Sequence, residues 1–162
     1  MVVALEVAVP ALRWSLGLLA LPHGLNKIYY DLPGFQKKAS AHLSTVVPGM
    51  PQPAAVALAT LGAGLQTAGA LAICVDFYTG PLSLASMAFY GVACHKVWNQ
   101  SDAAELVWMQ KTSASDNPGK FKSVDLLRFG PGFYMVGYGM LFAYTVLKKR
   151  PEPRTEPVDF MR

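Results

Sequence analysis

Charged residues are scarce in this chain and unevenly placed. Asp, Glu, Lys and Arg make up 15% of the 162 residues, whereas about a quarter of an ordinary soluble domain is charged. They are absent from residues 39–75, 77–95 and 129–147. A surface helix of a soluble protein needs a polar face towards water, so these runs argue against a soluble fold and predict segments embedded in a membrane.

Cysteine is scarcer still, with only Cys74 and Cys94. Two cysteines supply neither a disulfide framework nor the spacing of a zinc site. If the second and third apolar segments form a helical hairpin, Cys94 lies roughly 20 Å from Cys74 along the axis, too far for an intrachain disulfide. We therefore predict two free thiols.

A basic helix face with interleaved aromatic residues is also missing. The formal net charge is +4, but the basic residues lie in the connectors and the C-terminal tail. This placement argues against nucleic-acid binding. Basic residues beside apolar runs are typical of membrane proteins, where lipid phosphates are their neighbours.

The apolar segments predict an all-α fold, an integral membrane four-helix bundle with short interfacial helices in its connectors. Residues 1–150 would form this domain, and residues 151–162 a polar, Pro-rich tail. Such a tail has no core of its own, so a partner subunit is the simplest means of ordering it. The expected transmembrane helices cover residues 5–28, 53–75, 82–98 and 126–147, and the interfacial helices residues 35–47 and 103–111.

A few polar residues interrupt the apolar segments. Arg13, Gly17, Gly24 and Lys27 recur on one face of the first helix. Counting helical rise from the helix ends puts Arg13 at a depth similar to that of Gln66 on the second helix, so an Arg13–Gln66 hydrogen bond is expected. Contact with a lipid or a partner subunit is the alternative. Fastening the helices together is the simplest role for Arg13, Lys27 and Gln66, and a functional cation is the other.

His23 and His95 lie near the same end of the first and third helices. Two facing imidazoles could ligate a haem iron, or one could bind a quinone or chlorophyll; a lipid-headgroup contact is the simpler reading. No carboxylate or thiol pattern accompanies them. The sequence thus predicts no metal site and no catalytic residue.

Residues 13–17 (RWSLG) and 23–27 (HGLNK) resemble the opening of DoxX/DoxD-like membrane proteins, which typically show an Arg, a Gly four residues later, and HG..K. Residues 62–71 (GAGLQTAGAL) are similar to the family's second helix. The resemblance implies a four-helix membrane protein, and some members are quinone-linked oxidoreductase subunits. Gln66 stands where the family usually has an acidic residue, which weakens an inherited proton-transfer or redox role.

The expected function is a non-catalytic accessory subunit of a large energy-converting complex, in contact with other subunits and membrane lipids. The mitochondrial inner membrane is the expected location, with a thylakoid or bacterial plasma membrane as alternatives. Bound phospholipid is expected and no tightly bound cofactor, although quinone and haem stay open. The alternative function is a small quinone-linked oxidoreductase subunit, with Arg13, His23 and Gln66 near the quinone headgroup.

Overall fold

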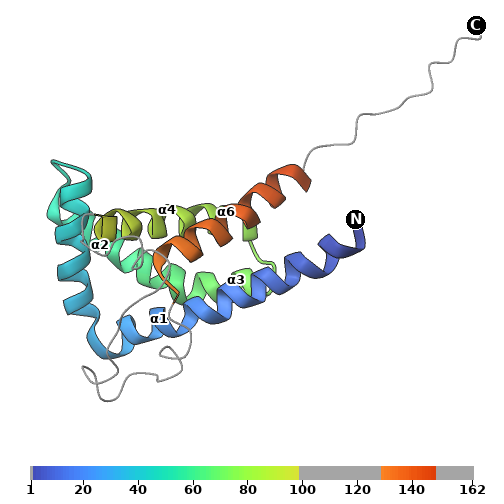
Figure 1. Cartoon of the computed structure of the whole chain (residues 1–162). Coiled ribbons are helices and arrows are strands. Elements are labelled where there is room, and N and C mark those ends of the chain that lie inside the picture. The colour runs from blue at the N-terminus through green and yellow to red at the C-terminus, as the bar shows by residue number, and fades with distance from the viewer. Residues whose placement is uncertain (1, 99–128, 149–162) are drawn as a thin grey trace, which may run out of the picture.

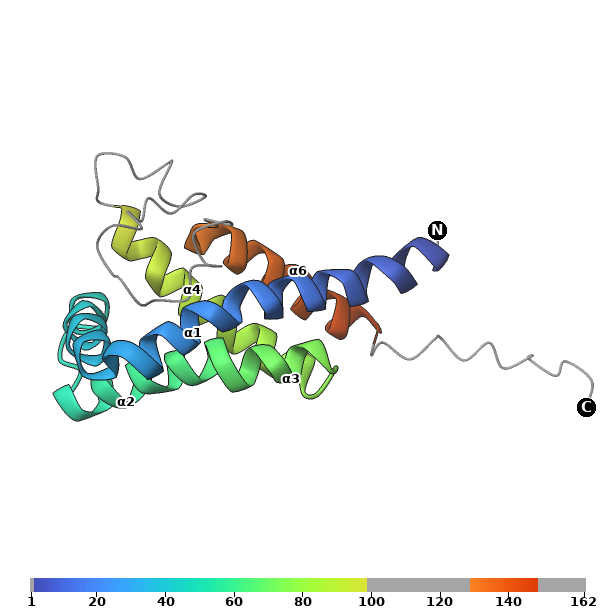
Figure 2. The same cartoon turned by 90° about the horizontal axis from the view of Figure 1, so that it is seen from below.

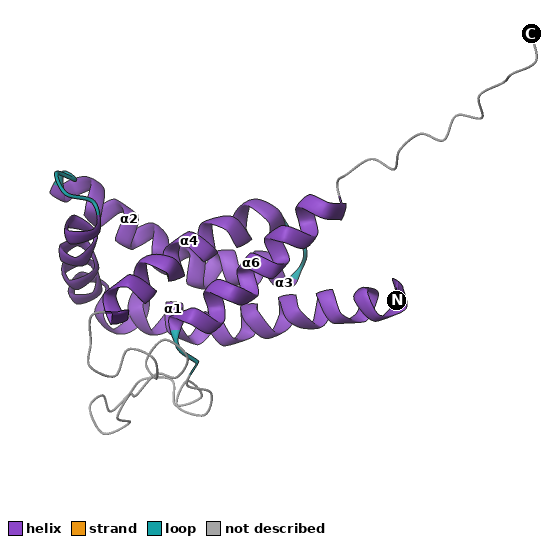
Figure 3. Cartoon of the chain, turned by 45° about the horizontal axis from the view of Figure 1, so that its top comes forward, coloured by secondary structure: helices purple, strands orange, loops and turns teal. Residues whose placement is uncertain are grey.

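The computed structural model describes residues 2–98 and 129–148, and every regular element in these ranges is helical (Figures 1 and 3). The all-α prediction is therefore confirmed. The predicted helix at residues 103–111 and the tail at residues 151–162 lie outside the described residues. The elements are α1 (Val2–Val46), α2 (Gln52–Gly64), the π-helical turn η1 (Leu65–Gly69), α3 (Ala70–Cys74), α4 (Thr79–Trp98) and α6 (Pro131–Lys148).

Three of these elements follow one another without a break. We call α2, η1 and α3 together the central rod, which covers Gln52–Cys74. Pro51 and Pro53 flank its first residue, where a missing N–H costs no helical hydrogen bond. Four long helical limbs thus pack together within the described residues: the first part of α1, the central rod, α4 and α6.

α1 bends sharply at Asp31, whose backbone is extended (φ −158°, ψ 61°). The Asp31 carboxylate accepts a hydrogen bond from the Gly34 N–H at 2.9 Å, so Asp31 caps the helix that follows, and Pro33 lies in its first turn. We call residues 2–30 the long limb and residues 32–46 the cross arm. The cross arm runs across one end of the bundle (Figure 1). The expected short helix at residues 35–47 is therefore present as the cross arm, which the bend at Asp31 separates from the long limb.

Two glycines set how the long limb lies against the central rod. A Cβ on Gly17 would lie 2.7 Å from the Ala70 carbonyl oxygen, and one on Gly24 would lie 2.6 Å from the backbone of Gln66. These contacts fix an antiparallel register in which Gly17 faces Ala70 and Gly24 faces Gln66. The N-terminal part of the long limb consequently projects beyond the α3–α4 turn (Figure 2).

Tyrosines join α4 and α6 to the long limb. The ring of Tyr90 stacks on those of Tyr134 (4.7 Å between centroids) and Tyr138 (5.8 Å). The Tyr134 hydroxyl donates to the Leu19 carbonyl at 3.2 Å, and that of Tyr138 to the Leu16 carbonyl at 3.4 Å. Backbone acceptors satisfy both hydroxyls, so these large rings can be buried without leaving a donor unpaired.

Among the described residues, one helix is both long and apolar enough to cross a membrane, namely the central rod with a mean hydropathy of 1.6. α4 contains Gly, Ser, His and Lys, and α6 contains three Gly, three Tyr and a Lys, which lower their hydropathy. Both cysteines are free, as predicted; Cys74 is buried and Cys94 is partly buried.

Candidate functional site

The π-helical turn in the central rod places a polar side chain inside the bundle. π-turns inside α-helices are rare and occur often at functional sites. Gln66 lies in this turn and is 4% exposed. Its Oε1 accepts a hydrogen bond from Lys27 Nζ, and its Nε2 donates to the Tyr90 hydroxyl at 2.8 Å. We call Lys27, Gln66 and Tyr90 the buried polar network; it joins α1, η1 and α4.

Aromatic rings complete the surroundings of the lysine. Its Nζ lies 4.9 Å from the ring centroid of Phe35 and 5.6 Å from that of Phe89. Phe35 belongs to the cross arm, so the bend at Asp31 brings this ring over the lysine. Within the described residues no carboxylate pairs with Lys27. Two aromatic ring faces and the Gln66 amide oxygen therefore stabilise the Lys27 amine in place of a carboxylate.

The Gln66 amide is bonded at both ends, whereas Lys27 uses one of its N–H groups and the Tyr90 hydroxyl acts as an acceptor in these bonds. Gln66 accepts from one neighbour and donates to the other, which fixes the orientation of its amide. An amine, an amide and a phenol can bind a carbonyl group. Among the described residues the network contains no carboxylate, and its bonds join α1, η1 and α4.

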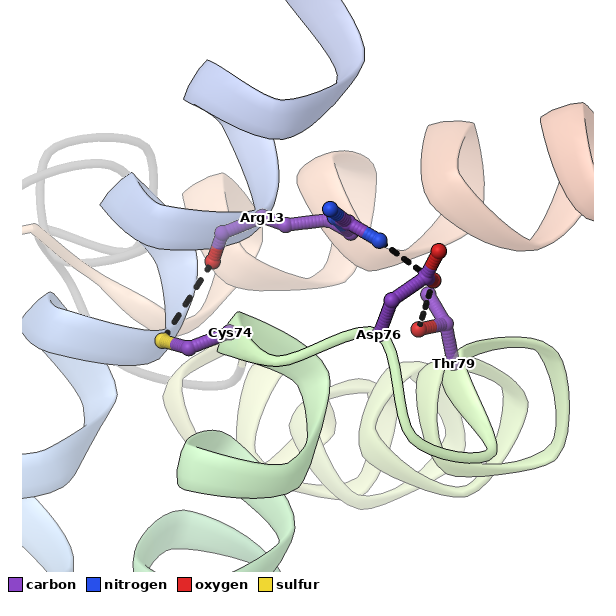
Figure 4. A network of polar contacts seen from close by, with 4 residues as sticks. All are labelled: Arg13, Cys74, Asp76 and Thr79. Carbon is purple, nitrogen blue, oxygen red and sulfur yellow. Dashed lines mark hydrogen bonds and ion pairs between the residues drawn. The ribbon is translucent and has the colours of Figure 1, made fainter.

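A second polar cluster lies at the α3–α4 turn, and we call Arg13, Asp76 and Thr79 the turn network (Figure 4). The Arg13 guanidinium points towards Asp76 and forms an ion pair with its Oδ1, which also accepts a hydrogen bond from Thr79 Oγ1 at 2.7 Å. These two donors hold the pKa of the Asp76 carboxyl below its usual value. Asp76 has a left-handed backbone (φ 63°), which Asp tolerates better than most residues.

The expected Arg13–Gln66 bond is not formed. Arg13 pairs with Asp76, while Gln66 bonds Lys27 and Tyr90. The prediction took the start of the first helix to be level with the end of the second. The glycine contacts instead slide the long limb outwards along the central rod, so that Arg13 lies beside the turn.

The two predicted histidines do not face one another. The ring of His23 meets Tyr134 edge-on at 5.9 Å, and the ring of His95 lies 5.7 Å from that of His42. His42 Nε2 also lies 3.1 Å from the Val92 carbonyl oxygen. Ligation of one iron by His23 and His95 would require a pairing that this arrangement does not make. In the described part of the chain, no group of three or more His, Cys, Asp or Glu side chains could hold a metal ion.

Several residues of the two networks escaped the sequence analysis. Asp76 carried a signal, because it is the single charged residue between the charge-free runs at residues 39–75 and 77–95. Pairing it with Arg13 required the helix register. Tyr90 and Phe35 carried no signal, since aromatic residues in apolar segments are common.

The comparisons with known proteins concern the family of the chain. The DoxX family model matches residues 8–98, which include the long limb from its second turn, the cross arm, the central rod and α4. No curated protein and no solved structure matches the chain. Membership of the family and the apolar central rod together indicate a membrane protein. Because the match covers more than half of the sequence, this chain belongs to the DoxX family.

Proposed function

We propose that this DoxX-family protein is a non-catalytic accessory subunit of a larger membrane complex. One observation carries the proposal: charged and polar side chains join one helix of the bundle to another. Lys27, Gln66 and Tyr90 form one chain of bonds, and Arg13 and Asp76 another. A catalytic site needs groups directed at the reacting atoms of a substrate. Groups that are used to fasten helices suit a structural subunit.

We also propose that all four limbs lie in the bilayer. The charge-free runs support this, as do large apolar side chains that are exposed along the long limb, the central rod and α6. Lipid or a neighbouring subunit would cover them. These exposed residues include Trp14, Leu18, Leu25, Leu58, Leu61, Leu71, Val136 and Met140.

The host that we propose is an energy-converting complex of the mitochondrial inner membrane, with a thylakoid or bacterial plasma membrane as the alternatives. With Gln66 in place of an acid, the described residues place no carboxylate beside Lys27 for proton transfer. A subunit of this kind would stabilise the complex, while other subunits would catalyse its reaction.

Separation of gently solubilised membranes on a native gel, followed by mass spectrometry of the co-migrating proteins, tests this proposal. We expect the chain to migrate with a large assembly and to leave it when Gln66→Leu disrupts the buried polar network. Gly64→Ala is the matched control, because a Cβ at Gly64 meets nothing within 4 Å. Migration of the wild-type chain as a small species without partners would contradict the proposal.

A quinone-linked oxidoreductase subunit is the second candidate, favoured by the buried Lys27 amine and Tyr90 phenol. Lys27 could donate to a quinone carbonyl, and His23 packs on Tyr134, which stacks on Tyr90. This candidate predicts electron transfer to quinone that falls at least tenfold in Lys27→Met and His23→Phe. Unchanged transfer in both variants would remove it.

A further inference from the structure

A cavity of about 190 Å³ lies at the end of the bundle where the long limb projects past the α3–α4 turn. It lies between the long limb, the start of α4 and the C-terminal part of α6. It is separate from the buried polar network. Its lining consists of Glu6, Val9, Pro10, Arg13, Asp76, Thr79, Leu141, Tyr144, Thr145 and Lys148.

Arg13 supplies a positive charge to the cavity wall. One terminal nitrogen of its guanidinium pairs with Asp76. The Nε–H is buried and has no hydrogen-bond partner among the described residues. Because the protein covers this atom, a ligand in the cavity would meet other atoms of the Arg13 side chain. Asp76 is largely exposed, so water screens much of its charge and leaves Arg13 able to attract an anion.

The cavity also has a second positively charged side chain, Lys148, and a negatively charged one, Glu6. Lys148 Nζ lies 5.8 Å from the ring centroid of Tyr144, and in the part of the chain that the structure describes no carboxylate forms an ion pair with it. Glu6 is an exposed carboxylate at the rim. The two cations and the two carboxylates, Glu6 and Asp76, cancel. A ligand that carries one phosphate and one amine would match this arrangement.

The surroundings match a lipid better than a free anion. The cavity lies beside the end of the apolar central rod, the level at which lipid headgroups meet a transmembrane helix. Val9, Pro10 and Leu141 add apolar walls that inorganic phosphate would not use. A cavity of about 190 Å³ has room for several water molecules, and so for a phosphate with a short substituent.

We propose that this cavity binds a phospholipid with an amine-bearing headgroup, the phosphate lying between Arg13 and Lys148 and the ammonium group at Glu6. The Arg13 guanidinium and Lys148 Nζ attract the phosphate, and the Glu6 carboxylate accepts from the ammonium group. Choline has no N–H to donate, and glycerol carries no cation, so ethanolamine lipids are preferred. The site is independent of the accessory role proposed above.

Native mass spectrometry of the purified full-length protein tests the proposal, with equimolar phosphatidylethanolamine, phosphatidylcholine and phosphatidylglycerol added. We expect one retained phosphatidylethanolamine in the wild type. Lys148→Gln should lower the affinity for this lipid by roughly tenfold or more, the effect of losing one charged hydrogen bond. Thr145→Leu should do the same by filling the cavity without changing a charge. Lys38→Gln is the control, because Lys38 is an exposed lysine on the cross arm, and it should retain the lipid.

Glu6→Gln tests the headgroup preference and should equalise the retention of phosphatidylethanolamine and phosphatidylglycerol. Equal retention of all three lipids by the wild type would overturn the proposal, as would unchanged retention in both Lys148→Gln and Thr145→Leu. ³¹P NMR with inorganic phosphate separates the two possible sources of a phosphate group. Phosphate binding that Lys148→Gln abolishes would assign the cavity to a free anion instead of a lipid.

Discussion

The two polar networks stabilise a cation in different ways. In the turn network Arg13 has an ionised carboxylate as its partner, and Asp76 is 63% exposed. In the buried polar network Lys27 meets an amide oxygen and two aromatic rings. Water reaches Asp76, so its carboxylate stays ionised at little cost in free energy. The partners of Lys27 are neutral, so the protein does not have to bury a second charge beside it. The comparison indicates that breaking the buried network should cost far more stability.

The largest effect is expected from Gln66→Leu. This change removes the acceptor of Lys27 and the donor to Tyr90, and it replaces Gln66 by an apolar side chain of similar bulk. Leaving a buried cation without its partner costs about 3 kcal/mol or more. Denaturant unfolding in detergent, followed by circular dichroism, measures this cost. Gln66→Glu keeps an acceptor for Lys27 and should lose clearly less; equal losses for the two variants would show that the acceptor is unimportant.

Gly24→Ala should come next. The added Cβ would lie 2.6 Å from the Gln66 backbone, so the long limb must move away from the central rod. Overpacking of this kind costs about 1–3 kcal/mol, and the shift would disturb both networks. Gly64→Ala is again the control and should be neutral or slightly stabilising, because Ala favours helix by about 1 kcal/mol over Gly. Similar unfolding curves for the two variants would contradict the proposed register.

Asp76→Asn should have a smaller effect. Asn tolerates the left-handed backbone at this position and can still accept a hydrogen bond from Thr79, so the variant removes mainly the ion pair with Arg13. An ion pair with an exposed partner contributes about 0.2–1 kcal/mol. Thermal unfolding at low and high salt measures it. A loss as large as that of Gln66→Leu would invalidate the contrast between the networks.

The pH dependence of the turn network is the smallest effect. The pKa of Asp76 is lower in the folded than in the unfolded protein, so the unfolded chain binds more protons in this range. The stabilisation is therefore fully present above the unfolded pKa of about 3.9 and is lost as the pH falls through the lower folded value. Asp76→Asn should flatten this acid slope. Parallel pH profiles of unfolding temperature for the wild type and the variant would contradict it.

The fold followed from the sequence further than the site did. Charge-free runs bounded by Pro and Gly located the helical limbs, because these features act locally. The register did not follow, since it depends on Gly17 and Gly24 meeting the backbone of another helix. Arg13 was therefore assigned to Gln66 instead of Asp76. At the bend, the Asp31 side chain accepts a hydrogen bond from the Gly34 N–H. The bend brings the Phe35 ring over Lys27, and nothing in the sequence indicated this contact.

The most direct test of the central claim uses Lys27→Met, which removes the amine and keeps most of the apolar stem. In the complex with which the chain co-migrates, the amount of assembled complex and the turnover per assembled complex would be measured separately. A structural role predicts that assembly falls while turnover per complex is unchanged. Normal assembly with lost turnover would show that Lys27 takes part in the reaction, and would contradict the account.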